Sequence, residues 1–210
     1  MIATIIDIVA SRNATPRNRR MLDKKLRNIL SQTFEQFEKY CDALPTLTQG
    51  DSIELLTHSW EPIVFLFHRL LMEELEFRVG LGTGKIIVHN ENADECDGPA
   101  FWNAREALDE IRQMKYMSRP AGFSIDENAA SEEKNAVIYS LLILSVLLGL
   151  STTQLRQCFY FIWEKKTISE ISETLKMSKA NVSKTLNKTV CFLLEEVMGF
   201  LNQNQEIHSK

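Results

Sequence analysis

The feature that most constrains this chain is the run from Thr167 to Lys188, TISEISETLKMSKANVSKTLNK. Apolar side chains recur at helical spacing in its first part: Ile168, Ile171 and Leu175. This spacing predicts a short helix with one buried face. We expect a second helix after a short turn, because Val182 and Leu186 are four residues apart and Ser178 is placed to cap the first turn. The run is therefore typical of a helix-turn-helix.

The outward face of the second predicted helix carries amines, amides and a hydroxyl, and no carboxylate. Its side chains are Lys179, Asn181, Ser183, Lys184, Asn187 and Lys188. Cations suit DNA phosphates, while amides and hydroxyls suit base edges in the major groove. We therefore expect these six residues to bind DNA. The alternative is a surface helical hairpin whose lysines are only a solvated face.

Charge is distributed unevenly along the chain. The whole protein has a formal net charge of −4, which argues against a coat protein that binds nucleic acid non-specifically. Residues 151–190, however, hold seven lysines and arginines against three glutamates. A basic module on an acidic protein is typical of a DNA-binding protein that docks through one defined face.

The same run resembles the helix-turn-helix of sigma-factor region four and of related response regulators. Their pattern is Glu-Ile-Ala-x-x-Leu, a turn, and Ser-x-x-x-Val, and it is matched by Glu170-Ile171-Ser172, Leu175, Ser178 and Val182. Those families usually have a glycine in the turn, where this chain has Lys176. A lysine can adopt the left-handed backbone conformation there at a modest steric cost.

Cysteine usage and hydropathy favour a cytoplasmic protein without a membrane partner. The four cysteines form no Cys-x-x-Cys pair and are widely spaced: Cys41, Cys96, Cys158 and Cys191. This spacing fits a reducing compartment and argues against a zinc or disulfide framework. The N-terminal apolar run contains Asp7 and lacks a basic segment, unlike a signal peptide. The apolar run Val137 to Leu150 is too short to span a bilayer, so we expect a helix that is buried or packed in a dimer.

Elements along the chain predict an α+β fold of two domains. We expect strands at 2–9, 44–48, 52–57 and 77–88, and helices at 16–40, 61–74 and 98–117. The resulting order, β-α-β-β-α-β, is that of a ferredoxin-like sheet with helices on one face. We place this first domain at residues 1–117, a polar linker at 118–133, an all-helical helix-turn-helix domain at 134–201 and a tail at 202–210.

Two aspartates in the first domain are candidate metal ligands. Asp7 interrupts the apolar first strand, and Asp51 lies on the turn between the second and third strands. In a ferredoxin-like sheet the first strand lies beside that hairpin, so the two carboxylates can converge. Close carboxylates favour Mg²⁺ or Mn²⁺, and such a metal often carries a nucleotide phosphate. The alternative is structural, because aspartate commonly forms turns and binds backbone amides.

Residues 2 to about 110 resemble class III nucleotide cyclases. The matching motifs are Asp7-Ile8-Val9-Ala10-Ser11, Gly50-Asp51, Arg78 to Gly84, Gly98-Pro99 and Ala104-Arg105. The resemblance implies a cyclase-palm fold in which Asp7 and Asp51 bind metals and Arg105 contacts the triphosphate. Cyclases carry a ribose-orienting asparagine four residues before the arginine, where this chain has Phe101. Their purine-selecting lysine and aspartate have no clear counterparts in 44–48 or 91–97, which favours ligand binding over rapid turnover.

Both halves together resemble the SatD family of bacterial proteins. That family joins a Gly-Asp-Ile-x-x-Ser-Arg opening, a Thr-x-Gly-Asp turn and an Asp-Gly-Pro-Ala-x-x-x-Ala-Arg-Glu-Ala helix to a C-terminal helix-turn-helix. The chain carries these motifs at 6–12, 48–51 and 97–107, with Ile6 in place of the first glycine. Arg12 follows Asp7 closely, so we expect it to bind a ligand phosphate.

The leading hypothesis is a DNA-binding transcriptional regulator that acts as a homodimer. Its cyclase-like domain would bind a divalent metal or a nucleotide as a sensing or dimerisation unit, and Val137 to Leu150 is the expected dimer surface. Two alternatives remain open. One is a Mg²⁺-dependent enzyme that transfers a nucleotidyl or phosphoryl group from a nucleoside triphosphate. The other is a non-catalytic scaffold for protein interactions.

Overall fold

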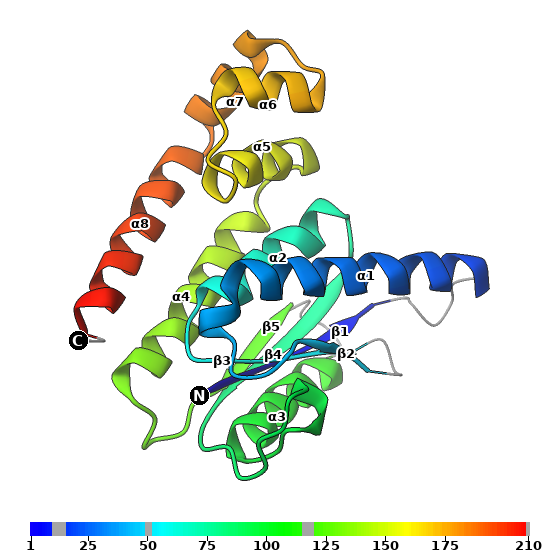
Figure 1. The fold of residues 1–210 in the computed structure, drawn as a ribbon, viewed down its shortest axis with the longest axis vertical. Coiled ribbons are helices and arrows are strands. Elements are labelled where there is room, and N and C mark those ends of the chain that lie inside the picture. The colour runs from blue at the N-terminus through cyan, green and yellow to red at the C-terminus, as the bar shows by residue number, and fades with distance from the viewer. Residues whose placement is uncertain (10–15, 49–51, 115–119, 209–210) are drawn as a thin grey trace. The chain divides into compact units, whose positions relative to one another are not determined.

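The computed structural model describes residues 1–9, 16–48, 52–114 and 120–208, with the backbone alone at 16, 17 and 202–208. These residues form a five-stranded sheet and eight α-helices, so the α+β class is confirmed (Figure 1). The chain divides into two compact units. Unit 1 comprises residues 1–70 and 75–142, and unit 2 comprises residues 71–74 and 143–210.

The sheet of unit 1 has the strand order β2-β3-β1-β4-β5. Its strands are β1 (Ile2–Ile8), β2 (Thr46–Leu47), β3 (Ser52–Thr57), β4 (Phe77–Thr83) and β5 (Ala121–Ser124). Neighbouring strands are antiparallel, except for β4 and β5, which are parallel. β1 is therefore a central strand, and its register pairs Asp7 with Ser52 on one side and with Arg78 on the other.

Helices cover both faces of this sheet. Their bounds are α1 (Pro16–Phe37), α2 (Glu61–Met72), α3 (Pro99–Gln113) and α4 (Ser131–Leu147). Figure 1 shows α1 and α2, the two helices of the expected β-α-β-β-α-β unit, on one face of the sheet and α3 on the opposite face. Coverage of both faces fits β1, where residues 2–6 are all buried. A strand that is buried on both faces gives a continuous apolar run instead of an alternating one.

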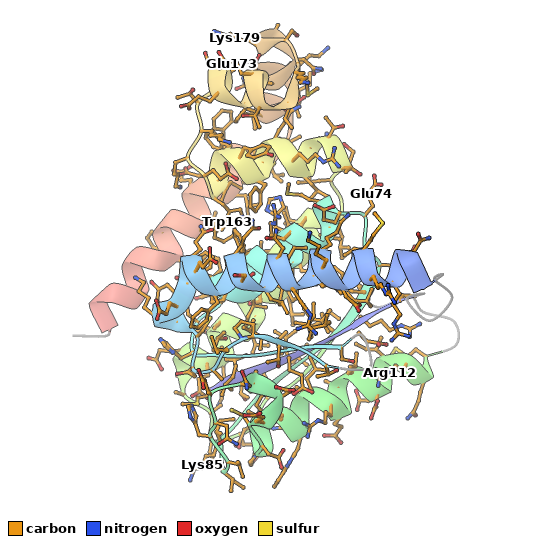
Figure 2. The ribbon with its side chains drawn as sticks, turned by 45° about the vertical axis from the view of Figure 1, so that its right-hand side comes forward. Glu74, Lys85, Arg112, Trp163, Glu173 and Lys179 are labelled. Carbon is orange, nitrogen blue, oxygen red and sulfur yellow. A yellow bond between two sulfur atoms is a disulfide. The ribbon has the colours of Figure 1, made fainter. Side chains whose placement is uncertain are left out.

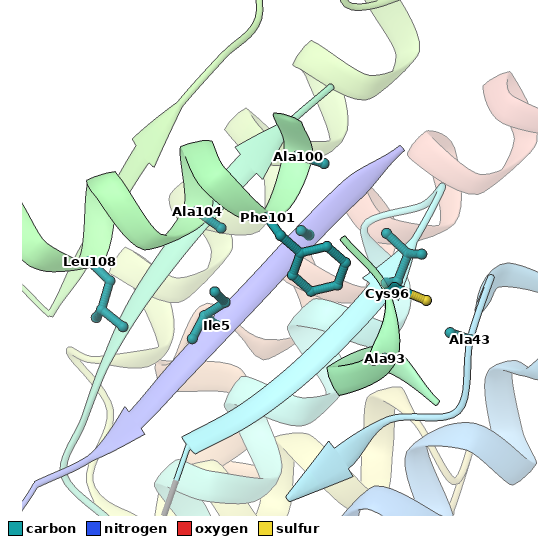
Figure 3. Close-up of a cluster of buried hydrophobic side chains, with 10 residues drawn as sticks. Ile5, Ala43, Ala93, Cys96, Ala100, Phe101, Ala104 and Leu108 are labelled. Atoms are coloured by element: carbon teal, nitrogen blue, oxygen red, sulfur yellow. The ribbon is translucent and has the colours of Figure 1, made fainter. Parts of the chain in front are cut away.

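One apolar cluster joins the α3 face of the sheet to its helix. Ala3 and Ile5 of β1 pack there with Ala100, Phe101 and Ala104 of α3 (Figure 3). The fully buried Phe101 ring fills this layer. Phe101 is therefore part of the hydrophobic core.

α3 lies unusually close to β4 because β4 has glycines at the contact. A Cβ atom on Gly80 would lie 2.1 Å from the carbonyl oxygen of Ala104. On Gly82 it would lie 2.2 Å from the carbonyl oxygen of Ala100. Both distances are far below a van der Waals contact, so any side chain at these positions would push the helix away from the sheet.

Several boundaries differ from those expected. β4 ends at Thr83, before the expected Val88. The segment 118–133, expected to be a linker, contributes β5 and the start of α4. β5 has only four residues and pairs with β4 across a long sequence separation, so its local pattern is weak. α8 continues to His208, where a tail was expected from Asn202.

Unit 2 contains four further helices, with termini fixed by local hydrogen bonds. They are α5 (Thr152–Ile162), α6 (Ile168–Leu175), α7 (Lys179–Lys188) and α8 (Cys191–His208). Thr167 and Glu170 form a capping box at the start of α6. The Ser178 hydroxyl accepts a hydrogen bond from the Asn181 amide at 3.2 Å, which confirms the predicted cap. Lys176 has φ 54° and ψ 45°, so the left-handed turn residue is also confirmed.

Two cysteines of unit 2 are joined by a disulfide, contrary to the expectation from their wide spacing. Cys158 of α5 and Cys191 of α8 are bonded, with their Cα atoms 5.4 Å apart. They are 33 residues apart in sequence, so no local spacing identifies the pair. Among the described residues, no helix combines the length and the apolar character that crossing a bilayer needs.

Candidate functional site

The surface of α7 carries most of the predicted DNA-binding side chains in an accessible position. Val182 and Leu186 are fully buried and hold the inner face of α7 in unit 2. The predicted residues that are exposed lie on the remaining faces: Lys179, Asn181, Lys184, Asn187 and Lys188. Ser183 is half-buried. Figure 2 labels Lys179 at the start of this surface.

The lysines of α7 have no partner within the described part of the chain. Neither a hydrogen bond nor an ion pair joins Lys179, Lys184 or Lys188 to a described residue. By contrast, the amine of Lys165 lies 2.9 Å from a carboxylate oxygen of Glu195. A lysine without an ion pair can bind a phosphate without first losing a carboxylate partner.

The amides of α7 are partly engaged along the helix itself. Asn187 donates its side-chain N–H to the carbonyl oxygen of Ser183 at 2.8 Å. The Thr185 hydroxyl donates to the Asn181 side-chain oxygen at 3.4 Å. Each amide therefore keeps hydrogen-bonding groups that are free to meet a base edge.

Lys176, one of the seven cations of residues 151–190, adds a further positive charge beside α7. It is exposed, it lies between α6 and α7, and no described residue pairs with it. In the sequence, Lys176 can be recognised as part of the basic surface of α7 because it lies two residues before Ser178, the cap of α7. Its amine extends the positive charge of α7 into the turn.

Asp7 lies at the end of β1 beside a cation that no sequence motif identifies. The Arg112 guanidinium on α3 lies 3.2 Å from the Asp7 carboxylate and 3.0 Å from the Asp109 carboxylate. The predicted partner Asp51 and the predicted phosphate ligand Arg12 lie outside the described residues. Ser52, which follows Asp51, pairs with Asp7 in the sheet.

The described residues near Asp7 do not form a metal site by themselves. No group of three or more His, Cys, Asp and Glu side chains in the described ranges could hold a metal ion. Arg112 supplies the counter-charge that a divalent cation would otherwise supply to Asp7.

Arg105 lies elsewhere on α3 and is held by other carboxylates. It is seven residues before Arg112, which corresponds to about 10 Å along the helix. Its guanidinium lies 3.4 Å from Asp97 and 3.9 Å from Glu54. Burial is the main cause that raises the pKa of Glu54, and the charge of Arg105 opposes that rise. The structure therefore does not bring Arg105 and Asp7 together.

A cavity of about 490 Å³ lies at the β2 edge of the sheet, between α1 and the short helix η3 (Ala93–Glu95). Its polar and apolar lining includes Arg27, Phe34, Leu47, Asn92, Asp94 and Glu95. A backbone hydrogen bond joins two segments beside the cavity: the amide of Leu44 donates to the carbonyl oxygen of Glu91 at 2.7 Å. The cavity thus lies between the segments 44–48 and 91–97.

Comparison with known proteins gives one family. The model of the SatD family matches residues 1–194, which include all of unit 1 and most of unit 2. No curated protein matches the chain significantly.

Proposed function

The chain belongs to the SatD family, and from the geometry of α7 we propose that it is a DNA-binding transcriptional regulator. In this proposal α6 and α7 form a helix-turn-helix, and α7 enters the major groove. The observation that carries the proposal is the exposed surface of α7, which has two asparagine side chains and three lysines. The lysines pair with no described residue. Buried Val182 and Leu186 fix the orientation of these side chains.

The lysines and amides of α7 have different roles in this proposal. Lysines contact phosphates, which adds affinity regardless of sequence and makes binding depend on salt. Asn181 and Asn187 offer both a donor and an acceptor, and an asparagine can pair with both edge atoms of adenine. Residues near the start of a recognition helix commonly contact the bases. This makes Asn181 the favoured base contact and Lys184 a favoured phosphate contact.

The test compares variants on a DNA sequence selected from a random pool by the wild-type protein. Lys184→Ala should weaken binding on all sequences and reduce the salt slope by about 1. Asn181→Ala should weaken binding by about 1–3 kcal/mol and relax the preference at one base pair. Lys24→Ala is the matched control, because Lys24 is an exposed lysine of α1 and its loss changes the charge equally. Unchanged DNA affinity in the Lys184→Ala, Asn181→Ala double variant would remove the recognition-helix assignment.

For unit 1, we propose that the β2-edge cavity binds a nucleotide, together with a divalent metal, as a sensing unit. The cavity residue Leu47 pairs with Ile53, which is next to Ser52, the partner of Asp7. Carboxylates and an amide at the cavity suit the hydrogen-bonding edge of a base. A bound Mg²⁺ would supply positive charge to the phosphates. Arg112 would then have to leave Asp7 and could meet a phosphate instead.

The nucleotide proposal is tested by isothermal titration with ATP and GTP, with and without Mg²⁺. A heat of nucleotide binding that requires Mg²⁺ and is lost in the Asp7→Asn and Asp94→Asn variants would support the proposal. The control variant Asp23→Asn, on α1, should bind the nucleotide as the wild type does. Product in the mixtures would identify the alternative of a nucleotidyl- or phosphoryl-transfer enzyme. No heat from the wild type would contradict nucleotide binding and leave the interaction scaffold as the function of unit 1.

A further inference from the structure

The Cys158–Cys191 disulfide closes a loop around the helix-turn-helix of unit 2. Cys158 lies in α5, and Cys191 is the first residue of α8. They are 33 residues apart, and the chain between them contains the end of α5, all of α6 and all of α7. Both cysteines are fully buried. The cross-link therefore acts on α6 and α7, because it removes conformations in which α5 and the start of α8 separate.

Both ends of α7 are tied to the same part of α5. At its C-terminal end, Thr189 caps α7, and only two residues separate α7 from Cys191. At its N-terminal end, the side-chain amide of Gln157 donates to the sulfur of Met177 at 3.4 Å, one residue before the cap of α7. Gln157 and Cys158 are neighbours in α5. The hydrogen bond at one end and the disulfide at the other thus fix how α7 lies against α5.

The surroundings of Cys191 favour cleavage of the bond. When a disulfide is reduced, one sulfur leaves as a thiolate, and a stabilised thiolate leaves faster. The Thr189 hydroxyl donates to the sulfur of Cys191 at 2.8 Å, although it also lies 3.4 Å from the carbonyl oxygen of Leu186. Cys191 begins α8, and the N-terminus of a helix stabilises a negative charge. Cys191 is therefore the favoured leaving sulfur.

The first turn of α8 gives a small thiol a way to the buried sulfurs. Val190 and Phe192, which flank Cys191, are 39% and 40% exposed. Only a local opening of this turn is needed to expose the bond, and such openings cost less than global unfolding.

We propose that the Cys158–Cys191 pair is a redox switch that controls how firmly α7 is held and, through it, how tightly the chain binds DNA. The control of DNA binding rests on the proposed function, whereas the control of α7 does not. The co-reactant is a small thiol with its disulfide, such as glutathione.

The reduction proceeds in two exchange steps. A small thiolate attacks the Cys158 sulfur and forms a mixed disulfide, while Cys191 leaves and takes up a proton. A second small thiolate then attacks the small-molecule sulfur of the mixed disulfide and releases Cys158, which is also protonated. Two electrons and two protons thus pass to the protein, and one small disulfide forms. Oxidation is the reverse of these steps.

The oxidised form should bind DNA more tightly than the reduced form. With the bond intact, α7 is already ordered against α5 before it meets DNA. Without the bond, part of the cost of ordering α7 falls on the binding step. We expect a difference of about tenfold in the dissociation constant, which is within the usual range for coupling between two sites.

The test equilibrates the full chain with reduced or with oxidised glutathione. Alkylation of the unfolded protein followed by mass spectrometry should find four thiols after reduction, and two fewer after oxidation. Fluorescence anisotropy then measures binding to a DNA sequence selected from a random pool by the oxidised protein. Hydrogen exchange measures α7 without DNA. Reduction should weaken DNA binding about tenfold and speed amide exchange in α7.

Two variants separate this pair from the other cysteines. The Cys158→Ala, Cys191→Ala double variant should show the affinity and the exchange of the reduced protein in both buffers. Cys41→Ala is the matched control, because Cys41 is a free cysteine that is partly buried, and it should respond as the wild type does. Thermal unfolding checks that each variant is folded.

Several outcomes would overturn the switch. It fails if the pair stays oxidised in excess reduced glutathione, or if oxidised glutathione never forms the bond. It fails equally if α7 exchanges at the same rate in both states, or if the double variant still responds to glutathione. A chain that binds DNA with equal affinity in both states also refutes it. By contrast, a chain that binds no DNA in either state but keeps the exchange response refutes the DNA proposal and leaves the control of α7 intact.

Discussion

At the scale of single residues, Glu61 shows how burial sets a charge. It begins α2 and is only 2% exposed. The Ser59 hydroxyl donates to one of its carboxylate oxygens, while the other, Oε1, is buried without a hydrogen-bond partner among the described residues. Burial is the main cause that raises the pKa of Glu61, and the hydrogen bond from Ser59 opposes the rise. Because the folded state holds the proton more tightly, stability falls as pH rises from about 4.5, the ordinary value, through the raised pKa.

We therefore expect Glu61→Gln to increase the free energy of unfolding at pH 7.5 by about 1 kcal/mol, since it removes a poorly paired buried charge. At pH 4, where the wild-type carboxyl is largely protonated, the two proteins should be nearly equal. Urea unfolding at both pH values measures the difference, with Glu106→Gln on the exposed side of α3 as the control. Destabilisation by Glu61→Gln at pH 7.5 that is absent at pH 4 would show instead that Glu61 is needed as a carboxylate.

Also at the residue scale, the Ser178 cap and the left-handed conformation of Lys176 could be predicted from the sequence, whereas the ion pair between Asp7 and Arg112 could not. The cap by Ser178 and the left-handed Lys176 depend on residues within three positions in the chain, so local spacing is enough. The ion pair of Asp7 with Arg112 joins residues that are 105 positions apart. It forms only because α3 packs across the end of β1.

At the scale of elements, the contact of α3 with β4 holds unit 1 together. A methyl group on Gly80 or Gly82 would lie little more than 2 Å from a carbonyl oxygen of α3. The helix residues facing these glycines, Ala100 and Ala104, are themselves small and fully buried. The sequence pattern identified a strand here but not the reason for its glycines, which lies in another element.

We expect Gly80→Ala to destabilise the protein by about 3 kcal/mol or more, because backbone atoms of α3 must move to admit the methyl group. Gly199→Ala on α8 is the matched control, since nothing lies within 4 Å of its Cβ position. It should stabilise the protein by up to about 1 kcal/mol, as alanine does in an exposed helix. Thermal unfolding compares the two, and a tolerated Gly80→Ala would mean that α3 is not closely packed.

At the scale of the whole molecule, the two units are stabilised in different ways. Unit 1 has a sheet covered on both faces, and unit 2 has short helices, caps and a disulfide. The disulfide closes a loop across 33 residues, which predicts a stabilisation of about 3–4 kcal/mol in the oxidised protein.

We expect dithiothreitol to lower the unfolding temperature of unit 2 while leaving that of unit 1 nearly unchanged. Differential scanning calorimetry of the oxidised and reduced protein measures both transitions. The Cys158→Ala, Cys191→Ala double variant should not respond to the reductant. A shift of equal size in that variant would assign the effect to Cys41 or Cys96, the free cysteines among the described residues.

The sequence by itself determined the features that depend on near neighbours: the α+β class, most helix positions, the Ser178 cap of α7 and the lysine-rich face of α7. Helical spacing and capping act within one or two turns, so one segment contains all the necessary information. Only the tertiary structure decided that α3 covers the second face of the sheet, that 121–124 is a strand and that Cys158 meets Cys191. It also separated Arg105 from Asp7. Each of these depends on contacts between residues far apart in the chain, which packing alone brings together.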